Sequence, residues 1–319
     1  MSHITNPLAS SAQLVRCQTR MAALGQPAEL LDVVFFAVQC LTQAAGLLLE
    51  LPQSTTARAC VVLARYWLVV PGFLATADGD GDDGIDYLHV SAAALYVVAK
   101  TGAAPRSARD LANVYAYLGA TVDFWGCQTD RDDDARDRSR SYLADAAYVA
   151  FHDRVLALEA RLLCALGFDT HVALPHPLAI TYLQAMDFLA VDSSNNNNSK
   201  APADAGSPAH TLARRAVAYL NTALLSPQLL YLTHQPHELA VAAVYSAARD
   251  GACHLPPGTP WWLVFDVDRE TLGFLAVALR SVASWADTLQ RSPSSLLTGG
   301  IVTRRRVAEA AAAWETIPS

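Results

Sequence analysis

The stretch Leu158–Pro177, LEARLLCALGFDTHVALPHP, combines a helical segment, a helix stop and a proline-containing connection. Leucine and alanine recur at three- and four-residue steps, which predicts an amphipathic helix, and Glu159 lies among its apolar positions. Gly167 is suited to end that helix, and Pro175 and Pro177 follow. An acid on an apolar face is buried unless it is paired or faces a partner. Two questions follow: which group pairs with Glu159, and which two parts of the chain the connection joins.

The composition limits the class of protein. The chain has 319 residues, enough for two domains, and 52% of them are apolar. The net charge of -7 at pH 7 argues against direct binding of nucleic acid, which requires a basic face. We expect no membrane span, because the longest apolar stretch is interrupted by Asp32, Gln39 and Gln43. We also expect no secretory signal, and reduced, mostly buried cysteines.

The apolar pattern predicts an all-α fold. Helical periodicity begins near Ala28, and no segment shows the period-two pattern of a strand. Proline, glycine and capping residues divide the pattern into separate helices. Helices are expected over 28–51, 55–69, 89–100, 105–118, a stretch that ends at 166, 175–186, 210–226, 237–250 and 269–290.

One internal sequence repeat indicates that the helices form two similar groups. The octets LYVVAKTG (Leu95–Gly102) and VYSAARDG (Val244–Gly251) both read aliphatic-Tyr-x-x-Ala-basic-x-Gly. Tyr96 and Tyr245 lie 149 positions apart (245 minus 96). Each octet ends a helix of small residues that we expect at the centre of a bundle. Two helical repeats of this length would be joined by the connection 166–177.

A D-D-x-x-D sequence at Asp133, Asp134 and Asp137 is typical of the Mg²⁺-diphosphate motif of isoprenoid synthases. Arginines alternate with these aspartates and no apolar stripe runs through them, so we interpret the segment as a solvated loop. An all-α Mg²⁺-dependent enzyme acting on prenyl diphosphates remains an alternative. The acidic run Asp78–Asp86 lacks the glycine and the glutamate of a calcium-binding loop and is read as a solvated turn.

Other candidate sites carry little chemical signal. His171 and His176 flank the connection without a suitably spaced cysteine or acid, so no metal site is predicted. Trp261 and Trp262 are more typical of a loop packed on the core than of a ligand-stacking pair. No phosphate-binding glycine loop or nucleophile elbow occurs. We therefore assign no catalytic residues and no cofactor.

Lys100 and Glu159 remain as candidate functional residues. Lys100 ends an otherwise apolar helix, where the helix dipole favours a cation and a long stem can reach solvent. Glu159 lies between Val155 and Leu162 on one helical face. If the two helices adjoin, the two side chains could pair with each other or reach together toward a second protein.

Several motifs, in order, resemble the cyclins. The motifs are LTQAAGLLLELPQ (Leu41–Gln53), AAALYVVAK (Ala92–Lys100), APRSARDLANVY (Ala104–Tyr115), the opening stretch, and ELAVAAVYSAAR followed by LP and WWLVF. The chain is most similar to transcription and RNA-processing cyclins, above all cyclin L, with cyclins Q, K and T next. The resemblance covers roughly residues 28 to 290.

The resemblance implies an all-α fold of two tandem cyclin boxes with about five helices each. The boxes would span 28–170 and 171–290, and the second would contain a flexible insertion at 193–208. Residues 1–27 would form an N-terminal extension and residues 291–319 a C-terminal tail. The internal repeat and the break at Gly167 agree with this division on independent grounds.

The resemblance also implies a function. Lys100 and Glu159 match the lysine and the glutamate through which cyclins contact their kinase. The chain would then be no enzyme itself, but the activating subunit of a cyclin-dependent Ser/Thr kinase. It would form a heterodimer with that kinase, and a further subunit could join. It would act in the nucleus, in RNA polymerase II transcription or pre-mRNA splicing. A cyclin-fold scaffold without kinase activation is the main alternative.

The sequence departs from the cyclin pattern at two places. Thr101, Gly102 and Ala103 stand where such cyclins usually have two acidic residues soon after the lysine, which points to a weaker or rearranged kinase contact. The segment Val34–Val38 has no basic residue at the position of the substrate-docking patch of cell-cycle cyclins, so that mode of recruitment is not expected.

Overall fold

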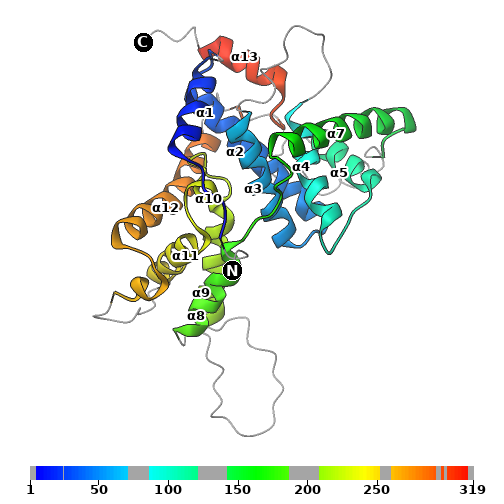
Figure 1. The fold of residues 1–319 in the computed structure, drawn as a ribbon. Helices are drawn as coiled ribbons and strands as arrows, with labels where there is room; N and C mark the ends of the chain where they lie inside the picture. Colours follow the sequence, from blue (N-terminus) through cyan, green and yellow to red (C-terminus); the bar gives the residue numbers. More distant parts are fainter. Residues whose placement is uncertain are drawn as a thin grey trace, which may run out of the picture. The chain divides into compact units, whose positions relative to one another are not determined.

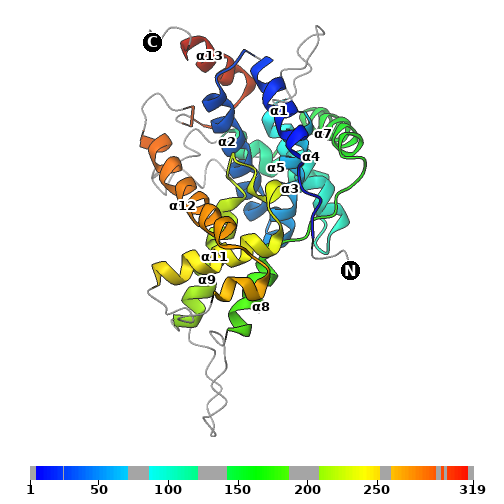
Figure 2. The ribbon, with the colours of Figure 1, turned by 60° about the vertical axis from the view of Figure 1, so that its left-hand side comes forward.

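A computed structural model describes residues 5–23, 25–70, 86–120, 142–186, 208–251, 260–291, 296–297 and 300–314. The described residues are helical and contain no strand, and the helices are shown in Figures 1 and 2. The chain divides into two compact units. The first unit comprises Ala9–Val172, Pro227–Leu229 and Ala286–Ser319, and the second comprises Met1–Leu8, Ala173–Ser226 and Leu230–Trp285. This division between 172 and 173 falls within the expected connection; the exact box boundaries stay predictions.

The first unit is a bundle around one central helix. Its helices are α1 (Ser11–Ala23), α2 (Ala28–Leu48), α3 (Gln53–Val69), α4 (Tyr87–Thr101), α5 (Ala108–Ala120), α7 (Asp145–Ala165) and α13 (Arg304–Trp314). Helix α4 packs against α2, α3, α5 and α7. Small residues on α4 allow this close approach, since Ala92, Ala93 and Ala94 are completely buried. The expectation of a central, buried helix ending at Lys100 is correct.

Several buried polar side chains of the first unit are hydrogen-bonded. The Ser91 hydroxyl on α4 lies 2.7 Å from both the Thr42 hydroxyl on α2 and the Tyr115 hydroxyl on α5. Thr42 also donates to the Val38 carbonyl, and Gln39 donates to the carbonyl of Cys60 on α3. Buried hydroxyls are costly unless they are hydrogen-bonded, so this chain of bonds fixes how α2, α4 and α5 meet.

Two helices of the first unit were not expected. Helix α1 packs on α2 and α3, and α13 packs on α2. Helix α1 is polar on average and buries Cys17 alone, so its sequence gives little sign of packing on the core. Helix α13 contributes the buried Val307, and its alanine run has high helix propensity that could have indicated it.

The second unit repeats the plan with different lengths. Its helices are α8 (Pro175–Ala185), α9 (Pro208–Ala223), α10 (Leu230–Thr233), α11 (Pro236–Asp250), the 3₁₀ helix η2 (Trp261–Phe265) and α12 (Arg269–Arg291), whose last residues belong to the first unit. Helix α11 is the counterpart of α4 and packs against α8, α9 and η2. Trp261 is buried, in agreement with a packing role for the tryptophan pair.

An asparagine ties the start of the chain to the second unit. The Asn6 side chain donates to the Ala173 carbonyl (2.8 Å) and accepts from the Ala173 amide (2.7 Å). The Asn6 amide donates to the side-chain oxygen of Gln235 (3.1 Å), whose side-chain nitrogen donates to the Asn6 carbonyl (3.0 Å). Asn6 is only 5% exposed, so these four bonds replace water entirely.

Several expectations lie wholly or partly outside the described residues. These are the acidic run at 78–86, the D-D-x-x-D sequence at 133–137, the charged segment at 129–141 and nearly all of the insertion at 193–208. Two described helices are long and apolar enough to cross a membrane, Ala28–Leu48 and Arg269–Leu289. The first is 72% buried over its most apolar window, as a core helix is. The expectation of no membrane span therefore stays a prediction.

Candidate functional site

Lys100 lies in the last turn of α4. At the other end of that helix, the Asp86 carboxylate accepts from the Tyr87 amide (2.8 Å) and the His89 side chain accepts from the Asp86 amide (3.0 Å), which caps the helix. The C-terminal dipole of α4 favours the ammonium group at Lys100. The Lys100 nitrogen also lies 5.2 Å from the centre of the Tyr96 ring, one turn earlier, at a cation–π distance.

Glu159 lies in the middle of α7, against α4. The Lys100 ammonium donates to the Glu159 carboxylate, so the structure brings together the two residues that the sequence selected. The Glu159 side chain is 10% exposed, whereas that of Lys100 is 41% exposed. The negative charge of Glu159 is thus balanced by Lys100, and the Lys100 ammonium remains accessible to solvent.

The contact between α4 and α7 is fixed a few turns away by an aromatic pair. The His89 ring lies 5.4 Å from the ring of Phe151 on α7. Burial, followed by the nearby Arg154 charge, lowers the pKa of His89 to about 4. His89 is therefore neutral at physiological pH, as its role as a hydrogen-bond acceptor for Asp86 requires.

The surface of α7 near Glu159 includes exposed aliphatic side chains. Val149 is 53% exposed and Leu156 is 40% exposed, although both are large aliphatic side chains. Residues 149, 156 and 159 follow the seven- and three-residue steps of one helical stripe. Exposed aliphatic residues in line with a buried, paired acid are typical of a surface that another protein covers.

The helix break after α7 is held by a residue that sequence reasoning missed. Gly167 has a φ of 58°, and the Phe168 amide donates to the Leu163 carbonyl (2.8 Å), which closes α7 with a glycine-dependent cap. The guanidinium of Arg65 on α3, 8% exposed, then donates to the His171 carbonyl (2.8 Å). Its charge faces Asp169 at 4.0 Å. Burial lowers the pKa of Arg65, and the Asp169 carboxylate partly opposes this shift.

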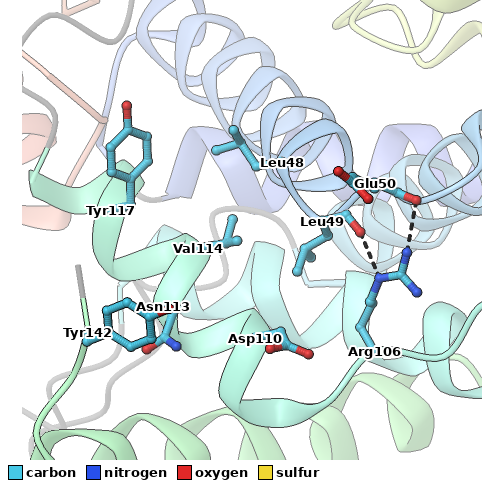
Figure 3. A pocket seen from close by; sticks show the side chains of 9 residues that line it. All are labelled: Leu48, Leu49, Glu50, Arg106, Asp110, Asn113, Val114, Tyr117 and Tyr142. Atoms are coloured by element: carbon cyan, nitrogen blue, oxygen red, sulfur yellow. Dashed lines mark hydrogen bonds between the residues drawn. The ribbon is translucent and has the colours of Figure 1, made fainter. Parts of the chain in front are cut away.

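A surface cavity of about 620 Å³ lies where the C-terminal end of α2 faces α5 (Figure 3). Arg106 closes one end: it donates to the Leu49 carbonyl (2.7 Å) and the Glu50 carbonyl (3.1 Å), which α2 leaves without helical partners. Asp110 lines the cavity between its two ends, and Tyr117 and Tyr142 lie at the end opposite Arg106. The guanidinium is occupied in capping a helix, so the cavity contains no assembled catalytic group.

The other candidates do not gather into a site. No group of three potential metal ligands occurs among the described residues. His176 lies 3.0 Å from the Asn221 side chain, and His171 lies in the connection that Arg65 holds. Val34, Phe35, Phe36, Ala37 and Val38 are all at most 4% exposed, so this segment forms core rather than a docking patch.

The sequence is similar to those of known proteins. The chain is 27% identical to human cyclin-L2 over 232 residues, which cover 73% of this chain and 36% of that protein. It is 27% identical to an uncharacterized cyclin-L1-like protein of Schizosaccharomyces pombe over 243 residues, or 75% of this chain and 78% of that protein. The chain thus spans about a third of the length of its vertebrate relatives. No protein-family model matches it.

Solved structures show the same fold. The chain matches a chain of the yeast RNA Pol II CTD kinase CTDK-1 complex with a TM-score of 0.60 at 15% identity, covering 99% of this chain and 84% of that one. It matches a chain of the Chaetomium thermophilum CAK complex bound to ATP-γ-S with a TM-score of 0.52 at 16% identity (94% and 80% covered). A viral cyclin from herpesvirus saimiri gives a TM-score of 0.50 at 15% identity (87% and 99% covered).

These matches confirm the all-α fold of tandem cyclin boxes that the sequence predicted. The order of motifs and the internal repeat agree with this assignment. On sequence and fold together, the chain is similar to the cyclins: it shares their fold, and its sequence is similar to that of cyclin L.

Proposed function

We propose that this protein is the activating subunit of a cyclin-dependent Ser/Thr kinase and is not an enzyme itself. The observation that carries the proposal is the Lys100–Glu159 ion pair, located beside exposed aliphatic residues of α7. The similarity of the chain to cyclin L, and its fold shared with a chain of a complex named as a kinase, support the same class. The proposed partner is therefore a cyclin-dependent kinase in a heterodimer.

The proposed kinase-binding face has a polar part and an apolar part. Lys100 supplies an accessible cation, and Glu159 holds that cation in place. Val149 and Leu156 supply the apolar surface along α7. A central apolar contact with a charged group at its edge is the usual arrangement of a specific interface, where burial gives affinity and charge selects the partner.

The mechanism would be conformational. In protein kinases, activity requires an ion pair between the glutamate of the αC helix and the ATP-binding lysine, together with an ordered activation loop. A rigid helix pair pressed on αC would hold that glutamate inward. Helices α4 and α7 suit this role because the ion pair and the His89–Phe151 contact both fix their relative position.

The segment after Lys100 makes the expected contact differ from that of related cyclins. Thr101, Gly102 and Ala103 add no carboxylate beside the cation, and the Thr101 hydroxyl donates back to the Val97 carbonyl (3.1 Å) of its own helix. Binding would then depend more on Lys100 and on the apolar stripe of α7. The kinase partner should carry an acceptor opposite Lys100.

The process proposed is RNA polymerase II transcription, with pre-mRNA splicing as the more specific possibility, and the location proposed is the nucleus. Support comes from the cyclin L relatives and from the fold shared with a chain of the yeast RNA Pol II CTD kinase complex. The proposal includes no cofactor, no direct contact with nucleic acid and room for a further subunit.

Kinase assays on reconstituted pairs test the proposal. The full chain is co-expressed with each cyclin-dependent kinase of its own proteome, and phosphorylation of an RNA polymerase II C-terminal repeat peptide is measured. One kinase should be activated at least about 100-fold relative to the kinase alone. A stable complex with no activation would favour the scaffold alternative, and no complex with any kinase would remove the proposal.

A further inference from the structure

The second unit repeats the cation–aromatic pair of the first. Lys100 lies 5.2 Å from the Tyr96 ring centre on α4, and Arg249 lies 5.8 Å from the Tyr245 ring centre on α11. The two pairs occupy matching positions of the repeated octets. Both close the last turn of the helix at the centre of their unit.

Each pair is followed by an ion pair to a later helix, but the polarity is reversed. In the first unit the central helix supplies the cation, Lys100, and α7 supplies the carboxylate. In the second unit the central helix supplies the carboxylate, Asp250, which accepts from Arg280 of α12. The Tyr219 hydroxyl of α9 also donates to Asp250. These bonds join three helices, and both views show α11 between α9 and α12 (Figures 1 and 2).

Exposed aliphatic and aromatic residues lie beside this second ion pair, as they do beside the first. Val277 is 70% exposed and Phe274 is 52% exposed, and both precede Arg280 on α12 at three-residue steps. The Phe274 ring is held by a stacking contact with His234, with 5.4 Å between the ring centres. This contact holds Phe274 in place, while Val277 stays exposed.

Three arginines lie near this ion pair in a chain whose net charge is -7. Arg280 is neutralised by Asp250, but no ion pair links Arg249 or Arg215 to a carboxylate of the described residues. Both side chains are exposed. Arg215 lies one helical turn before Tyr219, on the same side of α9. Glu270 lies one turn before Phe274 and is exposed, so the three arginines exceed Asp250 and Glu270 by one positive charge at this place.

We propose that this surface, here called the box-2 face, docks an acidic amphipathic helix of a second partner protein. The box-2 face consists of Arg215, Arg249, Asp250, Phe274, Val277 and Arg280. Apolar side chains of the partner helix cover Val277 and Phe274, and its carboxylates pair with Arg249 and Arg215. The inference does not depend on kinase activation.

The probe for this proposal is a pair of synthetic peptides. One is an amphipathic helix of about 20 residues with leucines at helical spacing and glutamates on both flanks. The other has lysine in place of every glutamate. Binding of each peptide to the full chain is measured by fluorescence anisotropy at about 0.05 M and 0.15 M salt. The acidic peptide should bind at least about tenfold more tightly, and less tightly at higher salt.

Variants connect the binding to the box-2 face. Arg249→Ala and Val277→Asp should each weaken binding of the acidic peptide at least about fivefold, because one removes the free charge and the other interrupts the apolar contact. Both positions are exposed, so the thermal midpoint should stay unchanged. The matched controls are Arg58→Ala on α3 and Val15→Asp on α1, both also at exposed positions. The controls should leave the peptide affinity unaltered.

Other partners of the box-2 face would give different experimental results. Equal binding of both peptides, or equal binding by the variants and the wild-type chain, overturns the proposal. Concentration-dependent dimerisation that Val277→Asp abolishes would assign the face to a second copy of the chain instead. Sedimentation with phosphatidylserine vesicles that depends on Arg249 and Val277 would assign it to a membrane surface. Kinase binding by the same variants is a separate readout, so failure here leaves the proposed function intact.

Discussion

The ammonium group of Lys100 donates to the carboxylate of Glu159, and the two side chains differ fourfold in exposure, 41% against 10%. A buried carboxylate without a partner would be strongly destabilising. Lys100 therefore stabilises the first unit at the same time as it presents a cation to solvent. Any variant of either residue changes both properties, and a useful experiment must separate them.

A charge swap separates the two properties. Lys100→Glu or Glu159→Lys alone brings like charges together and should lower the free energy of unfolding by roughly 1–3 kcal/mol, with solvent at Lys100 screening part of the cost. The double variant Lys100→Glu/Glu159→Lys should recover most of that loss in chemical denaturation. It should still bind kinase at least about tenfold more weakly, because the accessible charge is reversed. Recovery of kinase affinity along with stability would show that the pair is structural only.

The apolar stripe of α7 provides a second prediction. Leu156→Asp and Val149→Asp should each weaken kinase binding by at least about tenfold in a titration, since each places a charge in the proposed contact. Both residues are exposed, at 40% and 53%, so the free energy of unfolding should change by less than about 1 kcal/mol. Val15→Asp, at a position that is 59% exposed on α1, serves as the matched control. Unchanged kinase affinity in both α7 variants would move the interface elsewhere.

The fold was largely predictable because most helices carry an apolar stripe. Helix α4 and the repeat octets located the centre of each unit, and Gly167 located the end of α7. Helices α1 and α13 were not predicted because both are polar on average and bury few side chains.

The Lys100–Glu159 pair was predictable because a charge on an apolar face requires a partner. Arg65 was not predictable in the same way: an arginine between alanine and tyrosine normally reaches solvent, and its ligands are backbone carbonyls that leave no mark on the sequence. The cavity formed by α2 and α5 depends likewise on Arg106 meeting helix-terminal carbonyls. Side chain to backbone contacts between distant segments are the part of the structure that residue patterns do not encode.

His89 should make the stability of the first unit depend on pH. Its pKa is lowered to about 4 from the ordinary 6.5, so the unfolded chain binds the proton more tightly than the folded one. This contribution to stability is present above pH 6.5 and is lost as the pH falls toward 4, by on the order of 3 kcal/mol in total. The wild-type chain should therefore lose more stability between pH 6.5 and 4 than His89→Gln does, as measured by denaturant unfolding.

The ionisation of Asp32 changes stability with pH in the opposite direction, so the experiment needs a control for it. Burial raises its pKa to about 6, with the neighbouring Glu29 charge adding to the shift, so its ionisation weakens the folded state between pH 4 and 6. The comparison is therefore made in an Asp32→Asn background as well. An identical pH dependence with and without His89 in that background would contradict the prediction.

Asn6 should stabilise the second unit from a distance in sequence. Asn6→Ala removes two side-chain bonds and leaves the buried amide and carbonyl of Ala173 unpaired, which should cost roughly 2–4 kcal/mol. Gln18→Ala, at an exposed position on α1, is the control and should cost less than about 0.5 kcal/mol. Denaturant unfolding followed by hydrogen exchange at α8 and α11 measures both. A loss for Asn6→Ala no larger than that of the control would show that these bonds are not made in solution.

Purification of the full-length protein from its native source, followed by mass spectrometry of what remains bound at stoichiometric level, tests the central claim most directly. The account predicts one cyclin-dependent kinase in equal amount with the wild-type chain, active on Ser/Thr substrates, and its loss from the Leu156→Asp variant expressed at the same level. A stable set of partners that contains no protein kinase would contradict it.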